Sequence, residues 1–302
     1  MARFLVVLAV ALQLTPPGPA QFRARDGATL RYTTIGAGPP IVVLSGGPGF
    51  SSDYVRPIAE RLASRYRGIL LDQRGTGLST LTVYDRSTVT LAKYLEDLDE
   101  LRQALRLERL TLVGHSWGGM LAMAYAARYP ERVRALVLIG PGGPTLEFMR
   151  NFSLGIDARL TDEDRRERAY WENPERVTAN RRRAEVKQVM AVMPAYFHDR
   201  EKARGFVEGV KDEHYENRVF ELMMDDLEAT GYDLRPGLRG VRIPTLVIQG
   251  TQDPIATAEI VRDAVPGSRL ELIEECGHFP WLEQPDRFYS LVTAFLEGFR
   301  DP

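Results

Sequence analysis

The stretch that decides the fold is Val113–Gly119, which reads Val-Gly-His-Ser-Trp-Gly-Gly. It follows Leu110–Val113, an apolar run of the length of a buried strand, and continues into Trp117–Arg128, whose almost wholly apolar or small residues predict a helix buried on most sides. The stretch therefore contains G-x-S-x-G at a sharp turn from a strand into a helix. Side chains at Gly114 and Gly118 would collide where strand and helix nearly touch. This turn lifts the Ser116 hydroxyl clear of the sheet edge and predicts a nucleophile.

Short apolar runs alternate with helical segments on both sides of this turn. The clearest amphipathic helix is expected at Thr90–Leu107, and another closes the chain at Pro285–Phe299. Strands are expected at Thr29–Ile35, Ile41–Leu44, Gly68–Leu71, Ala135–Ile139, Pro244–Gln249 and Arg269–Ile273. The alternation predicts an α/β fold, with a mostly parallel central sheet flanked by helices.

The composition changes between Thr145 and Leu234, where no convincing β run occurs and Arg, Glu, Asp, Met and Tyr are frequent. We expect residues 21–144 and 235–302 to form the α/β core. Residues 145–234 are expected to form a helical cap inserted into that core, placed over Ser116. A group of apolar and aromatic side chains in it is expected to form a small core, and some of them could line a pocket: Trp171, Met190, Met193, Tyr196 and Phe197.

The N-terminal residues differ from the rest of the chain. Arg3 precedes the apolar run Phe4–Leu14, prolines follow, and the small residues Gly18 and Ala20 stand at the two positions that define cleavage. This pattern predicts a secretory signal peptide over residues 1–20 and a secreted or periplasmic protein. The run is short for a membrane span, so no stable membrane association is expected after cleavage. The alternative is an amphiphilic tail or an uncleaved anchor.

Charge and cysteine content exclude several classes of function. The chain has 39 basic and 41 acidic residues, a net charge of −2, which gives no indication of nucleic-acid binding. The single cysteine, Cys276, rules out an internal disulfide and a multi-cysteine metal site, and it is expected to be an inert buried thiol. No His, Cys and carboxylate spacing indicates a catalytic metal, and no cofactor is predicted.

A serine nucleophile needs a base within hydrogen-bond reach, and the base needs a third group to orient it. Asp253 and His278 each follow an expected strand, at the sheet edge where Ser116 also emerges. The order Ser, Asp, His is the one that this architecture uses. We therefore expect His278 to be the base and Asp253 its orienting acid. The backbone N–H groups of Trp117 and Gly47 are expected to form the oxyanion hole.

Other titratable residues are weaker candidates. His115 is expected to pack behind the turn, whereas His198 and His214 fall in the insertion, where His214 could touch substrate. Asp225 and Asp226 are the fallback acids. Within the Asp72–Ser79 loop, Asp72 and Arg74 are expected to brace the sheet edge by charged hydrogen bonds.

These motifs resemble the α/β-hydrolase superfamily and, within it, the proline iminopeptidase (prolyl aminopeptidase) family. The resemblance rests on Gly46-Gly47-Pro48-Gly49, Asp72-Gln73-Arg74-Gly75-Thr76-Gly77-Leu78-Ser79, Gly114-His115-Ser116-Trp117-Gly118-Gly119, Asp253 and Gly277-His278, which span nearly the whole chain. One departure is Ser45, where the family usually has a histidine before Gly-Gly-Pro-Gly.

The resemblance implies removal of the N-terminal residue, often proline, from short peptides. It also implies that acidic cap residues bind the substrate's free amine. Glu213 is the best candidate by position, Glu216 the next, with Glu221 and Glu228 as further candidates; the alternative for each is an exposed helix charge.

The sequence thus predicts a serine hydrolase that forms an acyl-enzyme, with a small peptide as substrate. The alternative is a carboxylesterase or amidase acting on small esters. Dehalogenase and epoxide-hydrolase chemistry is disfavoured because those relatives place Asp where Ser116 stands. A binding protein on the same fold is disfavoured because such proteins usually lose a member of the triad, and all three are present here.

Overall fold

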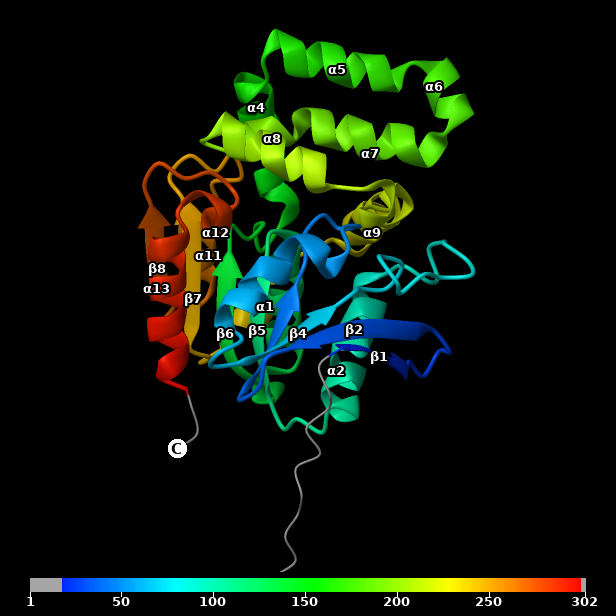
Figure 1. The fold of residues 1–302 in the computed structure, drawn as a ribbon. Helices are drawn as coiled ribbons and strands as arrows, with labels where there is room; N and C mark the ends of the chain where they lie inside the picture. The colour runs from blue at the N-terminus through cyan, green and yellow to red at the C-terminus, as the bar shows by residue number, and fades with distance from the viewer. Residues whose placement is uncertain (1–17, 300–302) are drawn as a thin grey trace, which may run out of the picture.

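The computed structural model describes residues 18–299. Eight strands form one sheet in the order β1-β2-β4-β3-β5-β6-β7-β8 (Figure 1). The first two strands pair antiparallel, as do β2 and β4, and every other pair is parallel. The strands are β1 (Gly18–Arg23), β2 (Thr29–Ile35), β3 (Pro40–Leu44), β4 (Arg67–Leu71), β5 (Leu110–His115), β6 (Val133–Ile139), β7 (Thr245–Gly250) and β8 (Arg269–Ile273).

Helices cover both faces of this sheet and bury two separate hydrophobic cores. One core contains buried residues of α1 (Arg56–Leu62) and α13 (Pro285–Glu297). The other contains those of α2 (Leu91–Ala104), α3 (Trp117–Arg128) and α11 (Ala258–Ala264). Because strands β3 to β7 are covered on both faces, they are continuous apolar runs rather than alternating ones. The predicted fold class is confirmed.

The chain between β6 and β7 is helical. Its α-helices are α4 (Met149–Arg159), α5 (Asp162–Glu172), α6 (Pro174–Ala179), α7 (Arg181–Val192), α8 (Arg200–Gly209), α9 (Asn217–Thr230) and α10 (Arg235–Leu238), with short 3-10 turns at Leu146–Phe148, Met193–Tyr196 and Asp212–His214. Figure 1 shows α4 to α8 stacked beyond one end of the sheet. That end is the carboxyl edge of the parallel strands, from which the predicted site residues emerge.

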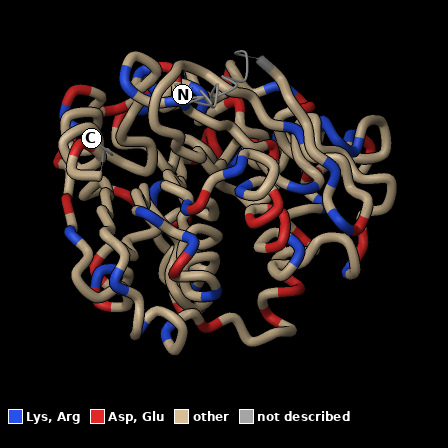
Figure 2. The backbone as a smooth tube through the Cα atoms, turned by 90° about the horizontal axis from the view of Figure 1, so that it is seen from below, with Lys and Arg blue, Asp and Glu red and all other residues tan. Residues whose placement is uncertain are grey.

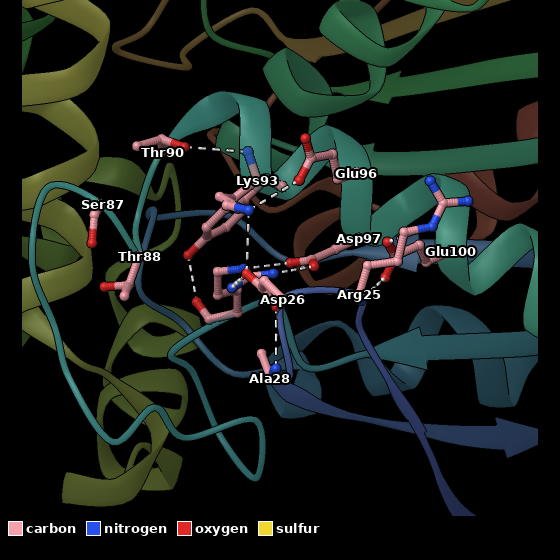
Figure 3. Close-up of polar contacts among 12 residues, drawn as sticks. Arg25, Asp26, Ala28, Ser87, Thr88, Thr90, Lys93, Glu96, Asp97 and Glu100 are labelled. Carbon is pink, nitrogen blue, oxygen red and sulfur yellow. Dashed lines mark hydrogen bonds and ion pairs between the residues drawn. The ribbon is translucent and has the colours of Figure 1, made fainter.

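Asp72 and Arg74 brace this edge, but through different partners. Asp72 accepts hydrogen bonds from the backbone N–H groups of Ser52 and Leu78, both at 2.9 Å. Arg74 is buried and donates to Asp97 on α2 and, at 2.7 Å, to Asp26, whose carboxylate also lies 3.5 Å from the Lys93 ammonium (Figure 3). Asp72 thus joins two loops, while Arg74 fastens its loop to α2.

Charges are not segregated on the molecule. Figure 2 shows basic and acidic residues intermingled along the backbone. Within residues 18–299, no helix combines the length and the apolar character needed to cross a membrane.

Most of the predicted signal peptide lies outside the described residues. Its last part, Gly18–Ala20, begins β1, in which Ala20 pairs with Tyr32 of β2. The apolar and proline-rich pattern of the N-terminus did not predict this strand.

Candidate active site

The turn at Ser116 has the geometry expected from its glycines. Ser116 lies between the end of β5 and the start of α3, with φ 56° and ψ −119°, a conformation that residues with a side chain rarely adopt. A Cβ atom at Gly114 would lie 2.3 Å from the carbonyl oxygen of Gly118, and one at Gly118 would lie 2.4 Å from that of Leu44. Only glycine fits at these two positions. The strained backbone carries Ser116 into a cavity at the sheet edge.

His278 and Asp253 meet beside this turn. His278 Nδ1 lies 2.9 Å from Asp253 Oδ2, and both side chains are buried. Asp253 Oδ2 also accepts from Gln249 Nε2 at 3.0 Å, and its Oδ1 accepts from the Ile255 N–H at 2.9 Å. These donors hold the carboxylate in place, so the Nδ1 proton of His278 points at it and Nε2 is left as the basic nitrogen.

Ser116 and His278 line the same cavity. The Ser116 hydroxyl forms no hydrogen bond to any residue in the described part of the chain, and neither does His278 Nε2. A contact between nucleophile and base commonly tightens only when substrate is bound. The structure therefore brings the three predicted residues to one place, with the serine and the base both open to the cavity.

The backbone of His278 is held on both sides. Its N–H donates to the carbonyl of Tyr196 (2.7 Å), and its carbonyl lies 2.9 Å from His115 Nε2. The other ring nitrogen of His115, Nδ1, lies 2.8 Å from the Tyr54 hydroxyl, which accepts the Gly46 N–H. Because Tyr54 accepts from Gly46, its own proton goes to His115 Nδ1, and His115 Nε2–H donates to His278. Burial holds the pKa of His115 well below its usual value, so the ring stays neutral within this series of hydrogen bonds.

This hydrogen-bond chain leaves specific backbone donors for an oxyanion. The N–H of Gly46 is taken by Tyr54, whereas those of Gly47 and Trp117 donate to no other described residue. Gly47 and Trp117 both line the cavity next to Ser116. Trp117 also begins α3, where free N–H groups and the helix dipole favour negative charge.

Gln73 links the two segments that carry these N–H donors. Its Nε2 donates to the carbonyl of Ser45 (2.8 Å), and its Oε1 accepts from the indole N–H of Trp117 (2.9 Å). The Ser45 hydroxyl in turn donates to the carbonyl of Phe50 (2.9 Å). Ser45, which stands where the resembled family has histidine, therefore pins its loop through a hydrogen bond from its hydroxyl group.

The cavity has a volume of about 260 Å³ and is apolar. Among the described residues that line it, none is Asp, Glu, Lys or Arg. A large part of its wall comes from the helices between β6 and β7, which contribute Val189, Val192, Met193, Phe206, Phe220 and Met224. A charged group entering this cavity would lose its hydration without gaining a counter-ion.

The structure does not bring the predicted amine-binding carboxylates to this cavity. Glu213, Glu221 and Glu228 are exposed, and none of them lines it. Glu216 is buried but is paired with Arg218, whose Nε and Nη2 each donate to it at 2.8 Å. The Arg218 guanidinium also lowers the pKa of Glu216, against the opposing effect of burial.

Glu216 belongs to a segment that is joined to the glycine-rich loop. The Ser51 N–H donates to the carbonyl of His214 (2.8 Å), and the Glu216 N–H donates to that of Gly49 (3.0 Å). Phe50 and Tyr215 form an antiparallel bridge between these hydrogen bonds. The segment before α9 therefore supports the loop that carries Gly47.

The other titratable residues lie away from the reacting groups. His198 is exposed, His214 and Asp226 are half-buried, and Asp225 pairs with Arg86 at the surface. Burial raises the pKa of the Cys276 thiol, which lies inside the core. Within residues 18–299, no group of three or more His, Cys, Asp or Glu side chains could hold a metal ion.

Sequence reasoning did not single out Tyr54 or Gln73 for the site, and it named Tyr196 only within a group of cap residues that could line a pocket. Gln73 lies in the Asp-Gln-Arg-Gly motif, so the motif itself was a signal for it. Tyr54 had no such signal, and nothing in the sequence placed Tyr196 beside the base, because each reaches the site only through packing between segments that are far apart in the chain.

Comparison with known proteins agrees with the fold. A family model described as the alpha/beta hydrolase fold matches residues 39–285. A proline iminopeptidase from Heyndrickxia coagulans is 28% identical over 89% of this chain and 94% of its own length. A cis-3-alkyl-4-alkyloxetan-2-one decarboxylase from Shewanella oneidensis is 26% identical over 93% and 89%. Among solved structures, a proline iminopeptidase-related protein from Thermus thermophilus superposes with a TM-score of 0.73 at 21% identity, over 95% of this chain and 99% of the other.

Proposed function

The chain belongs to the alpha/beta hydrolase fold family, and on this premise we propose that it is a serine hydrolase that cleaves esters of uncharged, hydrophobic carboxylic acids. The observation that carries the proposal is the apolar cavity beside Ser116, which no Asp or Glu among the described residues lines. Transfer of an acyl chain from water into such a cavity is favourable, by roughly 25 cal/mol per Å² of apolar surface buried.

In the proposed reaction, Ser116 Oγ attacks the ester carbonyl while His278 Nε2 takes the hydroxyl proton. Asp253 keeps the other side of the ring protonated and stabilises the imidazolium that forms. The N–H groups of Gly47 and Trp117 donate to the developing oxyanion, and each such donor typically contributes about 3–4 kcal/mol to lowering the barrier. His278 then returns the proton to the departing alcohol. Water attacks the acyl-enzyme by the same route and releases the acid.

An aminopeptidase of the proline iminopeptidase type is the second candidate, supported by relatives of that name at 26–28% identity. The decarboxylase relative is 26% identical, so identity alone does not separate these reactions. An aminopeptidase must bind a charged amine next to the scissile bond. The exposure of Glu213 and the pairing of Glu216 with Arg218 argue against either as the amine site.

A substrate panel tests the proposal. We expect p-nitrophenyl butyrate and hexanoate to be hydrolysed, with prolyl and alanyl arylamides turned over far more slowly. Ser116→Ala should lower kcat on the esters by roughly 10⁴-fold or more and abolish labelling by a fluorophosphonate probe.

Glu213→Gln and Glu216→Gln supply the matched controls. Neither should change the ratio of rates on free-amine and N-acetylated alanyl arylamides. Rapid cleavage of the free-amine arylamides, with a loss of that preference in either variant, would establish the aminopeptidase instead.

A further inference from the structure

Most polar side chains that line the cavity already have hydrogen-bond partners within the protein. Tyr54 and both ring nitrogens of His115 take part in the chain that runs from Gly46 to His278. The Tyr215 hydroxyl donates to Asn217 Oδ1 (3.3 Å), and Asn217 Nδ2 donates to Glu221 (2.8 Å). These groups hold the wall together and are not available to a substrate.

Three polar groups remain without a partner among the described side chains of the cavity wall: the Ser116 hydroxyl, His278 Nε2 and the Tyr196 hydroxyl. The proposed reaction uses the first two and gives no role to the third. A hydroxyl in an apolar cavity is unfavourable unless it finds a partner, so an unpartnered one beside a nucleophile and a base points to a group that the substrate supplies.

Tyr196 is held firmly next to the base. It ends the 3-10 turn Met193–Tyr196, and its carbonyl accepts the His278 N–H at 2.7 Å. Its ring centroid lies 5.4 Å from that of His278 and 5.7 Å from that of Phe152. Burial raises the pKa of the Tyr196 hydroxyl, which therefore remains a protonated donor throughout the neutral range.

The position of Tyr196 relative to the other groups indicates which substrate atom it faces. The oxyanion donors, Gly47 and Trp117, bind the carbonyl oxygen, whereas His278 delivers its proton to the leaving oxygen. Because Tyr196 packs against His278, which delivers the proton to the leaving oxygen, we expect its hydroxyl to face the leaving group rather than the carbonyl oxygen.

We propose that Tyr196 is a catalytic residue whose hydroxyl donates a hydrogen bond to the leaving-group oxygen of the ester. This inference rests on the proposed function. The Ser116 proton passes to His278 as the Ser116 Oγ–carbon bond forms. The bond from the carbonyl carbon to the leaving oxygen then breaks, and His278 gives its proton to that oxygen. Tyr196 keeps its own proton and stabilises the charge that develops on the oxygen.

The contribution of Tyr196 must then depend on the leaving group. An alkoxide is strongly basic and gains much from a hydrogen bond as the bond to carbon breaks, whereas p-nitrophenolate is stable on its own. Alkyl esters of hydrophobic acids are therefore the substrate class that this site is built to cleave.

Tyr196→Phe tests this with two esters of the same acid, ethyl butyrate and p-nitrophenyl butyrate. The measured quantity is kcat/KM, which reports acylation, because both esters share one deacylation step. We expect kcat/KM to fall roughly tenfold for the ethyl ester and by less than about twofold for the p-nitrophenyl ester. The p-nitrophenolate burst counts active sites, so a poorly folded fraction cannot imitate the effect.

Tyr289→Phe is the matched control, because the Tyr289 hydroxyl donates to the carbonyl of Pro57 outside the cavity. It should leave both kcat/KM values as in the wild type. If Tyr196→Phe lowers kcat/KM by the same factor for both esters, or for neither, the proposed role of Tyr196 is overturned. If the wild-type protein hydrolyses neither ester, the proposed function itself fails.

Discussion

At the scale of single residues, Ser116 has the least favourable backbone conformation of the site. Its φ of 56° and ψ of −119° lie in a region that glycine occupies far more readily than serine. Such strain costs about 1–3 kcal/mol of folding free energy. The fold tolerates this cost because the same conformation projects the hydroxyl into the cavity, beside the free N–H of Trp117.

Comparing Ser116→Gly with Ser116→Ala measures this strain. Both variants lack the hydroxyl, but only glycine relaxes the backbone, so we expect Ser116→Gly to have the larger free energy of unfolding, by about 1–2 kcal/mol. Urea unfolding followed by tryptophan fluorescence would determine the difference. Equal stability of the two variants would contradict the interpretation of Ser116 as strained.

At the scale of elements, Asp99 on α2 connects this helix to its neighbours. It accepts hydrogen bonds from Arg102 (2.9 Å), Gln103 (2.6 Å) and the Tyr125 hydroxyl of α3 (3.0 Å), and Arg132 lies 2.9 Å from it. Burial raises the pKa of Asp99, but these donors more than offset that effect and lower the pKa from 3.8 to about 2. The folded state therefore holds Asp99 ionised more strongly than the unfolded chain does.

This difference predicts a pH-dependent contribution to stability. A lowered carboxyl pKa stabilises the fold above pH 3.8, and the contribution is lost as the pH falls towards 2. We expect Asp99→Asn to lower the free energy of unfolding by about 1–2 kcal/mol at pH 7, and the deficit to shrink as the pH falls from 5 to 3.

Urea titrations at several pH values would check this. Asp263→Asn serves as the control, because Asp263 is exposed and, among residues 18–299, pairs only with its neighbour Arg262, so its substitution should have little effect. A deficit for Asp99→Asn that stays constant from pH 7 to pH 3 would argue against an ionic contribution.

At the scale of the whole molecule, the site is assembled from loops that follow β3, β5, β7 and β8. The carboxyl ends of parallel strands share one edge, so residues as distant as Gly47 and His278 meet there. The helices between β6 and β7 close the space above and determine which molecules fit into it.

The predicted cleavage of the N-terminal segment also bears on the whole molecule, because the cleavage point falls within β1. The predicted cleavage after Ala20 would leave Gln21–Arg23 of β1 still paired with β2. We expect N-terminal sequencing of the exported protein to begin at Gln21. Recovery of the protein only inside the cell, with Met1 in place, would refute export.

The sequence alone was sufficient to predict the α/β class and the turn at Ser116. It was also sufficient to predict which loops share the sheet edge. These properties follow from local rules: glycines where backbones nearly touch, apolar runs of strand length, and a parallel order that puts Asp253 and His278 beside the serine. The strand β1 escaped prediction, because its pairing with β2 leaves no clear pattern in Gly18–Arg23.

Only the tertiary structure decided what lines the cavity. The local sequence around a glutamate does not reveal whether its side chain faces solvent, as that of Glu213 does, pairs with an arginine, as that of Glu216 does, or faces a substrate. Tyr196 similarly lies beside the base only because its turn packs against the loop that carries His278. Packing between distant segments sets which side chains reach a cavity, and it is not encoded in the spacing of neighbouring residues.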